Sequence, residues 1–473
     1  MLHATVPVLF ESSENLSILH DPVNEDWLAL VQAIDGPSFE MLARRYYLAL
    51  THFRQQKGRP PLPDQTTIEA TGKQQAFLAA PLHGLPDDPG SVFRLLRRNP
   101  VFAHWCGFLG PKVLKEPEEL TSRRLPARTV CEEFSEVMTR YGLWHLARVE
   151  KVIHNLASGV VELEDTVSFD TTHVEAYSHC GNVVPADREV DDGKKPKQRK
   201  VPRLKKNCTC GKENWETCIH SWVPTDEGAA VVVKGPTRVY WAHKGSVAAF
   251  GRSEIPFDVR ICHYAAEHDG NTLVPHLKLL NRDLALVMAV LAYVLADDAY
   301  QGNKEKVRQF GLKARLIRPV HPRKVRATLA RQFDGIDHFT ALGIPVCEAD
   351  HRFELRGRDI SGERYIWVAP DDEAGHPVCQ GCPHAGTCLS KGKRRNIRVH
   401  RNDLPQLDWD HPQLSARERK RYQQRTGVER AIKRLKVDLK GEILSHRDAR
   451  RVQAHFDRKL LTLHLLLAIA HPT

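Results

Sequence analysis

The spacing of hydrophobic residues predicts a helical first third of the chain. Segments such as "FEMLARRYYLALTHFRQQ" and "ARTVCEEFSEVMTRYGLWHLARVEKVIHNLAS" place apolar residues near the 3.6-residue period of an amphipathic helix. Proline-rich breaks, "GRPPLPDQ" and "PLHGLPDDPG", separate these segments. Residues 1–150 are therefore predicted to form a helical domain.

Beyond residue 150 the pattern becomes that of strands. "VVELEDTVSFDTTHVEAY" is rich in β-branched and aromatic residues, and "AAVVVKGPTRVYWAHKGSVAAFG" predicts one or two further strands around a turn at Gly235-Pro236. "NRDLALVMAVLAYVLADDAY" predicts a helix that passes into a short buried strand ending at Asp297. "KARLIRPV" predicts a strand, "RFELRGRDISGERYIWVAP" a hairpin, and the last sixty residues are helical again. This order indicates an α/β (α+β) domain with a mixed sheet over residues 151–473.

Two polar segments interrupt the predicted sheet and are expected to be insertions. The first spans about 179–228 and contains the basic stretch "REVDDGKKPKQRKVPRLKK". The second spans about 340–410; it holds the predicted hairpin and a segment dense in cysteine, histidine, lysine and arginine.

Composition and charge narrow the possible functions. The chain of 473 residues has a formal net charge of +11, which favours a polyanionic partner. The longest apolar run, Leu284–Ala296, has thirteen residues and is too short to span a membrane. The N-terminus shows no secretory signal, so a cytoplasmic, nucleoid-associated location is expected. In that reducing setting the eleven cysteines indicate metal ligands or free thiols rather than disulfides.

Three carboxylates stand out by their positions. Asp170 lies within a predicted strand, Asp297 ends one, and Glu429 is the single acid among six lysines and arginines in "RYQQRTGVERAIKRLK". Each has an ordinary explanation, namely a turn or cap for either aspartate and an ion pair with Lys433 for the glutamate. Together they fit phosphodiester chemistry by two divalent ions, which needs carboxylates that converge from different elements.

The helix that carries Glu429 is predicted to present one functional face. At about 100° per residue, Tyr422, Arg425, Glu429 and Lys436 fall within roughly 60° of one another. A solvated charged helix has no need of that alignment.

This arrangement, Tyr422-x2-Arg425-x3-Glu429-x6-Lys436, resembles the Y-R-E-K signature of bacterial insertion-sequence transposases of the DDE type. "SFDTTHVEA" is similar to the strand that carries the first aspartate of that family. "AEHDGNTLVPHLKLL" with "YVLADDAY" is similar to the approach to the second, and "RRNPVFAHWCGFLG" and "LPARTVCEEF" are similar to its helical N-terminal region.

The resemblance implies an RNase H-like catalytic domain in which Asp170, Asp297 and Glu429 hold two Mg²⁺ or Mn²⁺ ions. It also implies DNA contacts, which are expected from Tyr422, Arg425, Arg430, Lys433 and Lys436. The sequence departs from the family at Ala299, where glycine is usual. Asp298 is an alternative to Asp297, which is preferred because the family's aspartate stands three residues before a tyrosine, here Tyr300.

The implied function is a DNA transposase that hydrolyses phosphodiesters at the ends of its element and joins them to target DNA. Its partners would be the double-stranded terminal inverted repeats, the target and a second copy of the chain. Residues 1–150 would bind DNA ends or mediate dimerisation. The alternatives are a related nuclease without strand transfer and a non-catalytic, zinc-stabilised DNA-binding protein.

Two cysteine clusters have spacings that suit structural zinc. "CTCGKENWETCIH" offers Cys208, Cys210, Cys218 and His220. "HPVCQGCPHAGTC" offers Cys379, Cys382 and Cys388, for which the fourth ligand stays open between His384, His376 and His400, in that order of preference. The other cysteines are scattered and are predicted to be mostly small buried hydrophobes: Cys106, Cys131, Cys180, Cys262 and Cys347.

Overall fold

The computed structural model describes most of the chain in two compact units. It describes residues 34, 37–60, 67–83, 85–108, 125–177, 182–183, 198–199, 201–202, 220–221, 226, 228–234, 238–300, 314–318, 327–340, 343–389, 392–401, 403–404 and 416–471. Unit 1 comprises Met1–Ala292 and Gly427–Thr473, and unit 2 comprises Tyr293–Thr426.

The N-terminal part of unit 1 is helical, as the hydrophobic spacing predicts. Its helices are α3 (Pro37–Gln56), α4 (Thr67–Ala79), α5 (Pro89–Arg98), α6 (Pro100–Trp105), α7 (Arg128–Arg140) and α8 (Leu143–Ala157), with a 3-10 turn, η1 (Ala80–His83). Their apolar faces, with Phe77, Phe134 and Trp144 at the centre, form one core. The helix α16 (Ala449–Ala470), from the far end of the chain, contributes Leu461 and Leu465 to that core.

The sheet of unit 1 is built around one long strand. Strand β7 (Arg238–Phe250) pairs antiparallel with β1 (Thr166–Glu175), β6 (Ala230–Lys234) and β8 (Pro256–Ile261). Four two-residue strands pair apart from it: β2 (Asn182–Val183) with β3 (Gln198–Arg199), and β4 (Val201–Pro202) with β5 (His220–Ser221). The predicted strands are confirmed, and these residues form them because β-branched and aromatic side chains suit a pleated, buried surface.

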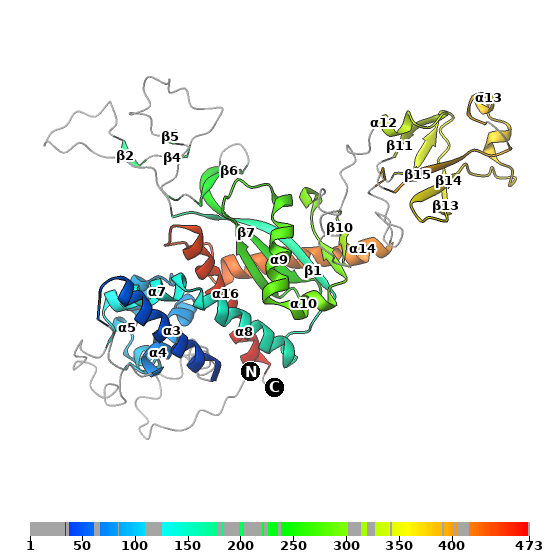
Figure 1. Ribbon diagram of the computed structural model, residues 1–473. Coiled ribbons are helices and arrows are strands. Elements are labelled where there is room, and N and C mark those ends of the chain that lie inside the picture. The colour runs from blue at the N-terminus through cyan, green and yellow to red at the C-terminus, as the bar shows by residue number, and fades with distance from the viewer. Residues whose placement is uncertain are drawn as a thin grey trace. The chain divides into compact units, whose positions relative to one another are not determined.

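Helices cover both faces of this sheet. On one face Phe169 of β1 packs edge-on against His276 of α9 (Leu273–Asp283), which is followed by α10 (Ala285–Val290). On the other face the strands contribute Val174, Val247 and Val259 to a core that α15 (Thr426–Lys433), the turn after it and α16 complete. Helix α16 packs against β8 and against α8 (Figure 1), and its buried residues include charged ones such as Asp457 and Arg458.

A buried arginine links the helices to the sheet within unit 1. Arg148 of α8 has no exposed side-chain surface; its Nη2 lies 2.8 Å from Asp258 Oδ1 of β8, and its Nε donates to Asp457 Oδ1 of α16 at 2.9 Å. Nη1 donates to the carbonyl of Phe257. A buried guanidinium is tolerated only with such partners, so these bonds fix α8, β8 and α16 together.

Unit 2 contains three small sets of strands. Strand β9 (Tyr293–Leu295) pairs in parallel with β10 (Arg315–Ile317), β11 (Ile336–Phe339) pairs antiparallel with β12 (Pro345–Cys347), and β14 (Arg364–Val368) lies between β13 (Glu354–Arg358) and β15 (Asn396–His400). The helices are α12 (Ala327–Ala330), α13 (Ala385–Cys388) and α14 (Ala416–Tyr422). The predicted hairpin is thus confirmed, as is the mixed helix-and-sheet class of the whole chain.

Candidate active site and metal-binding clusters

Asp170 projects from β1 toward the face that α15 covers. It stands opposite Val247 of β7, and residues directly opposed in an antiparallel pair share a face of the sheet. Val247 belongs to the core that Val428 and Leu435 of α15 and its following turn help to form. The carboxylate is half-buried, and its Oδ1 accepts the backbone N–H of Thr171 at 2.8 Å.

The helical segment that carries Glu429 is bonded to β1 on one flank and to Glu254 on the other. On one flank Lys436 donates from Nζ to the carbonyl of His173 on β1 at 2.9 Å. On the other, Arg430 pairs with the carboxylate of Glu254, and Arg434 donates to the carbonyl of Glu254 at 3.1 Å. Glu429 is exposed and lies on α15, and Lys436 lies in the helical turn that follows, so this contact brings the segment that carries Glu429 against β1.

The expectation of one regular helix from Tyr422 to Lys436 is wrong. Helix α14 ends at Tyr422, a 3-10 turn, η9 (Gln423–Arg425), leads into α15, and a π-helical turn, η10 (Arg434–Asp438), follows it. After the π turn, the N–H of Gly441 donates to the carbonyl of Leu435 at 2.9 Å. Residue 441 must be small, because a Cβ at this position would lie 2.3 Å from that carbonyl oxygen. A 3-10 turn winds more tightly than an α-helix and a π turn less tightly, so the two changes rotate the face in opposite senses.

Asp297 lies in unit 2, shortly after the end of β9. Its Oδ1 accepts the N–H of Ala299 at 3.0 Å, and Nη2 of Arg425 lies 4.0 Å from its Oδ2. Arg421 stacks on the ring of Tyr293, 4.0 Å from the centroid. Unit 2 thus brings the arginine of the signature to the predicted second acid. The side chain of Asp298 lies outside the described residues, so the choice between the two aspartates stays open.

The structure therefore brings some of the predicted site residues together in each of the two units. In unit 1 the strand of Asp170 meets the helix of Glu429 and Lys436, and in unit 2 Arg425 meets Asp297. The convergence of all three acids on common ions stays a prediction, as do the DNA contacts of Tyr422, Arg430 and Lys433.

A buried lysine opposite His173 in the sheet was not foreseen from the sequence. Lys244 of β7 is almost fully buried and donates from Nζ to Asp269 Oδ1 at 2.7 Å. Burial lowers the pKa of His173, and the nearby Lys244 and Lys436 lower it further, although Asp269 opposes them. His173 is thus held neutral near pH 7. The only signal in the sequence is a lysine inside the apolar run "YWAHKGSVAAF".

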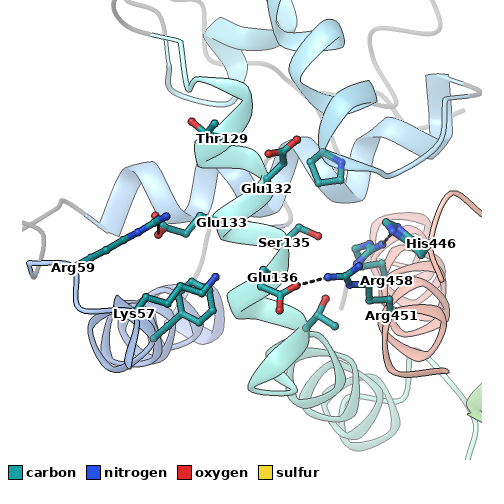
Figure 2. A pocket seen from close by; sticks show the side chains of 13 residues that line it. Lys57, Arg59, Thr129, Glu132, Glu133, Ser135, Glu136, His446, Arg451 and Arg458 are labelled. Atoms are coloured by element: carbon teal, nitrogen blue, oxygen red, sulfur yellow. Dashed lines mark hydrogen bonds and ion pairs between the residues drawn. The ribbon is translucent and has the colours of Figure 1, made fainter. Parts of the chain in front are cut away.

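A second cluster of potential ligands lies near a cavity in the helical part of unit 1. The cavity has a volume of about 570 Å³, and its wall includes Glu136, Arg451, His446 and Arg458 (Figure 2). Behind it Asp87, His446 and His455 bring three donor atoms within 4.8 Å of one another.

The partners already present at Asp87 do not fit a metal ion. Its two oxygens face His455 Nδ1 at 2.7 Å and Arg458 Nε at 2.6 Å, and Lys459 Nζ is 3.7 Å away. His455 has its other ring nitrogen against the carbonyl of Gly441 at 3.1 Å. Two fixed cations beside the carboxylate repel a divalent ion, so this cluster is a structural ion network.

Three further side chains have the order of a hydrolase triad. Ser246 Oγ lies 2.8 Å from His276 Nδ1, and His276 Nε2 lies 3.0 Å from Asp258 Oδ2. All three residues are buried to 1% exposure or less. A substrate has no access to this serine, and the group ties α9 to β7 and β8.

The structure describes the side chains of the second cysteine cluster but not those of the first. Cys208, Cys210 and Cys218 lie outside the described residues, and of His220 only the backbone is described, in β5. In the second cluster Cys379 and Cys388 are buried and Cys382 is half-buried. His384, the preferred fourth ligand, has its Nδ1 3.4 Å from Glu348 Oε2.

Two of the scattered cysteines confirm the prediction of small buried side chains. Cys106 and Cys131 are buried in the helical core, and burial raises the pKa of the Cys131 thiol to about 11. Cys262 and Cys347 are only half-buried, and Cys180 lies outside the described residues.

A family model described as the transposase DDE domain matches residues 370–465. The match supports a DDE transposase family and, with it, a transposase-type function in nucleotidyl transfer, which implies DNA binding and generally divalent metal ions. The matched range includes Arg425 and Glu429 but neither Asp170 nor Asp297. No curated protein and no solved structure matches the chain. In the described ranges, no helix is long and apolar enough to cross a membrane.

Proposed function

We propose that this protein is a DNA transposase in which Asp170, Asp297 and Glu429 form one metal-dependent site. The observation that supports this most strongly is the contact between Lys436 and the carbonyl of His173, which holds the helix of Glu429 against the strand of Asp170. Arg425, beside Asp297, precedes Glu429 by only four residues in the sequence. Two or three carboxylates from separate elements are the usual ligand set for Mg²⁺ or Mn²⁺.

The residues around the acids suit a polyanion. Lys436 carries positive charge to the strand of Asp170, and Arg425 carries it to Asp297, where both would bind phosphates at the cleavage site. Tyr422 would contact or support the DNA end. Arg430 and Lys433 would bind the backbone farther out, with Arg430 exchanging its partner Glu254 for a phosphate.

The reaction has two steps at the same site. Water attacks the phosphodiester at each end of the element and releases a 3′-hydroxyl, and that hydroxyl then attacks a phosphodiester of the target, whose own 3′-oxygen leaves. Two bound divalent ions would supply activation of the nucleophile and stabilisation of the leaving oxygen. The three acids hold these ions, and the flanking cations orient the phosphates.

The remaining parts of the proposal concern partners. The DNA would be the terminal inverted repeats and a target, held by two copies of the chain in the cytoplasm, with the helical N-terminal region binding DNA ends or the second copy. The formal charge of +11 supports this class of partner. Zinc would stabilise both cysteine-containing insertions.

The test is a cleavage and joining assay with Mn²⁺ on DNA that carries both flanks of the coding sequence. Asp170→Ala and Glu429→Ala are expected to lose cleavage by on the order of a thousandfold while DNA binding is retained. Glu442→Ala, which removes an exposed acid in the turn that follows η10, is the matched control and is expected to cleave normally. Asp297→Ala and Asp298→Ala, compared side by side, identify the second acid.

Undiminished cleavage in Asp170→Ala and Glu429→Ala would overturn the proposed site. Cleavage without joining would replace the transposase by a nuclease. DNA binding with no cleavage by the unsubstituted chain would leave a non-catalytic DNA-binding protein.

A further inference from the structure

Cys347 ends β12 at a corner of unit 2 where the chain turns sharply. Ile336 of β11 is its partner in the strand pair, and the next residue, Glu348, donates its N–H to the carbonyl of Gly335 at 3.2 Å. The carbonyl of Cys347 accepts the N–H of Asp350 at 2.8 Å, which closes a tight turn. Cys347 is thus placed rigidly beside Gly335.

Cys388 packs against the same glycine from another segment. A Cβ at Gly335 would lie 2.4 Å from Cys388 Cβ and 3.1 Å from Cys388 Sγ, and Gly335 has a φ of +73°. Only glycine permits this approach without displacement. His384, four residues before Cys388, faces Glu348 across 3.4 Å. The turn that bears Cys388 therefore meets the corner that bears Cys347 at two points.

The remaining two cysteines belong to the same neighbourhood. Cys379 lies in the 3-10 turn η8 (Val378–Gln380) and is buried in the core of this part of unit 2, with Cys347 packed against that core. The carbonyl of Cys382 accepts the N–H of Ala385, in the turn that leads to Cys388.

We propose that Cys347, Cys379, Cys382 and Cys388 bind one Zn²⁺ ion as a tetrahedral site of four thiolates. Four cysteines are a common structural zinc set. Cys347 takes the place of His384 as the fourth ligand, because the corner that bears Cys347 is bonded to Gly335, on which Cys388 packs. The side chain of His384 is 44% exposed and faces Glu348. The other candidates are also directed elsewhere, because His376 is 70% exposed beside Asp372 and His400 faces Glu363.

The other three cysteines lie close enough to Cys388 to act on its charge. Burial raises the pKa of Cys388, and the neighbouring Cys382, Cys379 and Cys347 raise it further, whereas Arg395 lowers it. Thiols that disfavour one another's ionisation become thiolates together once a divalent ion lies between them. Among the described residues, the group whose donor atoms all lie within 4.8 Å of one another is Asp87, His446 and His455, not the cysteines. The cysteine side chains must therefore rotate before their sulfur atoms can bind one ion.

The ion would have a clear structural role. The core around Phe339, Tyr365 and Trp367 is small and joins three short strand pairs. One Zn²⁺ would fix β12 to the turns at 379–382 and 385–388, replacing burial that so few residues cannot supply. This inference does not depend on the proposed DNA chemistry.

The test measures metal content and coordination in the purified full chain. Zinc per chain is compared between the unsubstituted protein and Cys347→Ser, Cys347→His, His384→Ala and Cys262→Ser. The last is the matched control, because Cys262 is also half-buried and belongs to unit 1. Only folded material is compared, as judged by circular dichroism and size-exclusion chromatography. Exchange of zinc for Co²⁺ gives a thiolate-to-cobalt absorption band that reports the sulfur ligands.

Cys347→Ser is expected to lose one equivalent of zinc, and Cys347→His to keep it with a weaker sulfur band. His384→Ala and Cys262→Ser are expected to keep both the metal and the band. The reverse result, with zinc lost in His384→Ala and kept in Cys347→Ser, would make His384 the ligand. Equal zinc in the unsubstituted chain and in Cys379→Ser would show that these cysteines are buried thiols.

Discussion

Two groups of charged residues in unit 1 differ in how their charges are satisfied. In the group that joins α8, β8 and α16, Arg148, Asp258 and Asp457 are at most 2% exposed, and the arginine pairs with both aspartates. In the group at β1 and α15, Asp170 is half-buried and Glu429 is exposed. The first group is closed to water and to ligands, and the second is accessible to both. Burial with saturated partners therefore marks charges that stabilise the fold, and accessibility marks those available for chemistry.

The largest effect on stability is expected from breaking the buried group. Arg148→Ala leaves Asp258 and Asp457 buried without their shared cation, which costs about 3–5 kcal/mol of unfolding free energy. Denaturant unfolding followed by circular dichroism measures it. The matched control is Arg252→Ala, which removes an exposed pair with Glu162 and is expected to cost less than about 1 kcal/mol. Equal losses in both variants would contradict the distinction.

The next effect is a dependence of stability on pH. Burial lowers the pKa of His464 from 6.5 to about 4, and its Nε2 contacts the carbonyl of Pro256 at 3.1 Å. The unfolded chain therefore takes up a proton below pH 6.5 that the folded chain refuses until about pH 4, so stability falls as the pH is lowered through that window. One such group contributes a slope of about 1.4 kcal/mol per pH unit. His464→Gln is expected to reduce the slope measured by unfolding at pH 4, 5, 6 and 7, and an unchanged slope would contradict the assignment.

A smaller effect on stability is expected on the accessible side. Asp170→Asn and Glu429→Gln keep the size of each side chain and remove only its charge, so each is expected to change the unfolding free energy by no more than about 1 kcal/mol. Thermal unfolding without added metal is the measurement. A loss as large as that of Arg148→Ala would mean that these acids are structural.

The smallest effect is expected at the outer flank of α15. Glu254→Gln removes the charge of the half-buried partner of the exposed Arg430 and should alter stability by less than about 1 kcal/mol. It also releases a cation toward DNA, so binding at low salt should tighten by a few-fold and the gain should shrink at high salt. Fluorescence anisotropy at two salt concentrations tests this. Unchanged affinity would remove Arg430 from the predicted DNA contacts.

The sequence predicted the secondary structure well, and the ligand sets stay predictions. The strand around Asp170 and the hairpin at 354–368 follow from local patterns that tertiary contacts reinforce. The regular helix from Tyr422 to Lys436 was wrong, because the way the chain turns at Gly441 is not encoded in the spacing of apolar residues. Cys347 was assigned to the scattered cysteines because it stands 32 residues before Cys379 in the sequence.

The sequence by itself determined the helical and strand segments, the basic character of the chain and the set of acids worth testing, since these depend on periodicity, composition and short motifs. The tertiary structure decided which face of the sheet Asp170 occupies, which flank of α15 meets β1 and which segments surround Cys388. The physical reason is that strand register and helix packing are set by contacts between residues far apart in the chain. Short-range patterns specify an element, but only those long-range contacts determine what lies opposite it.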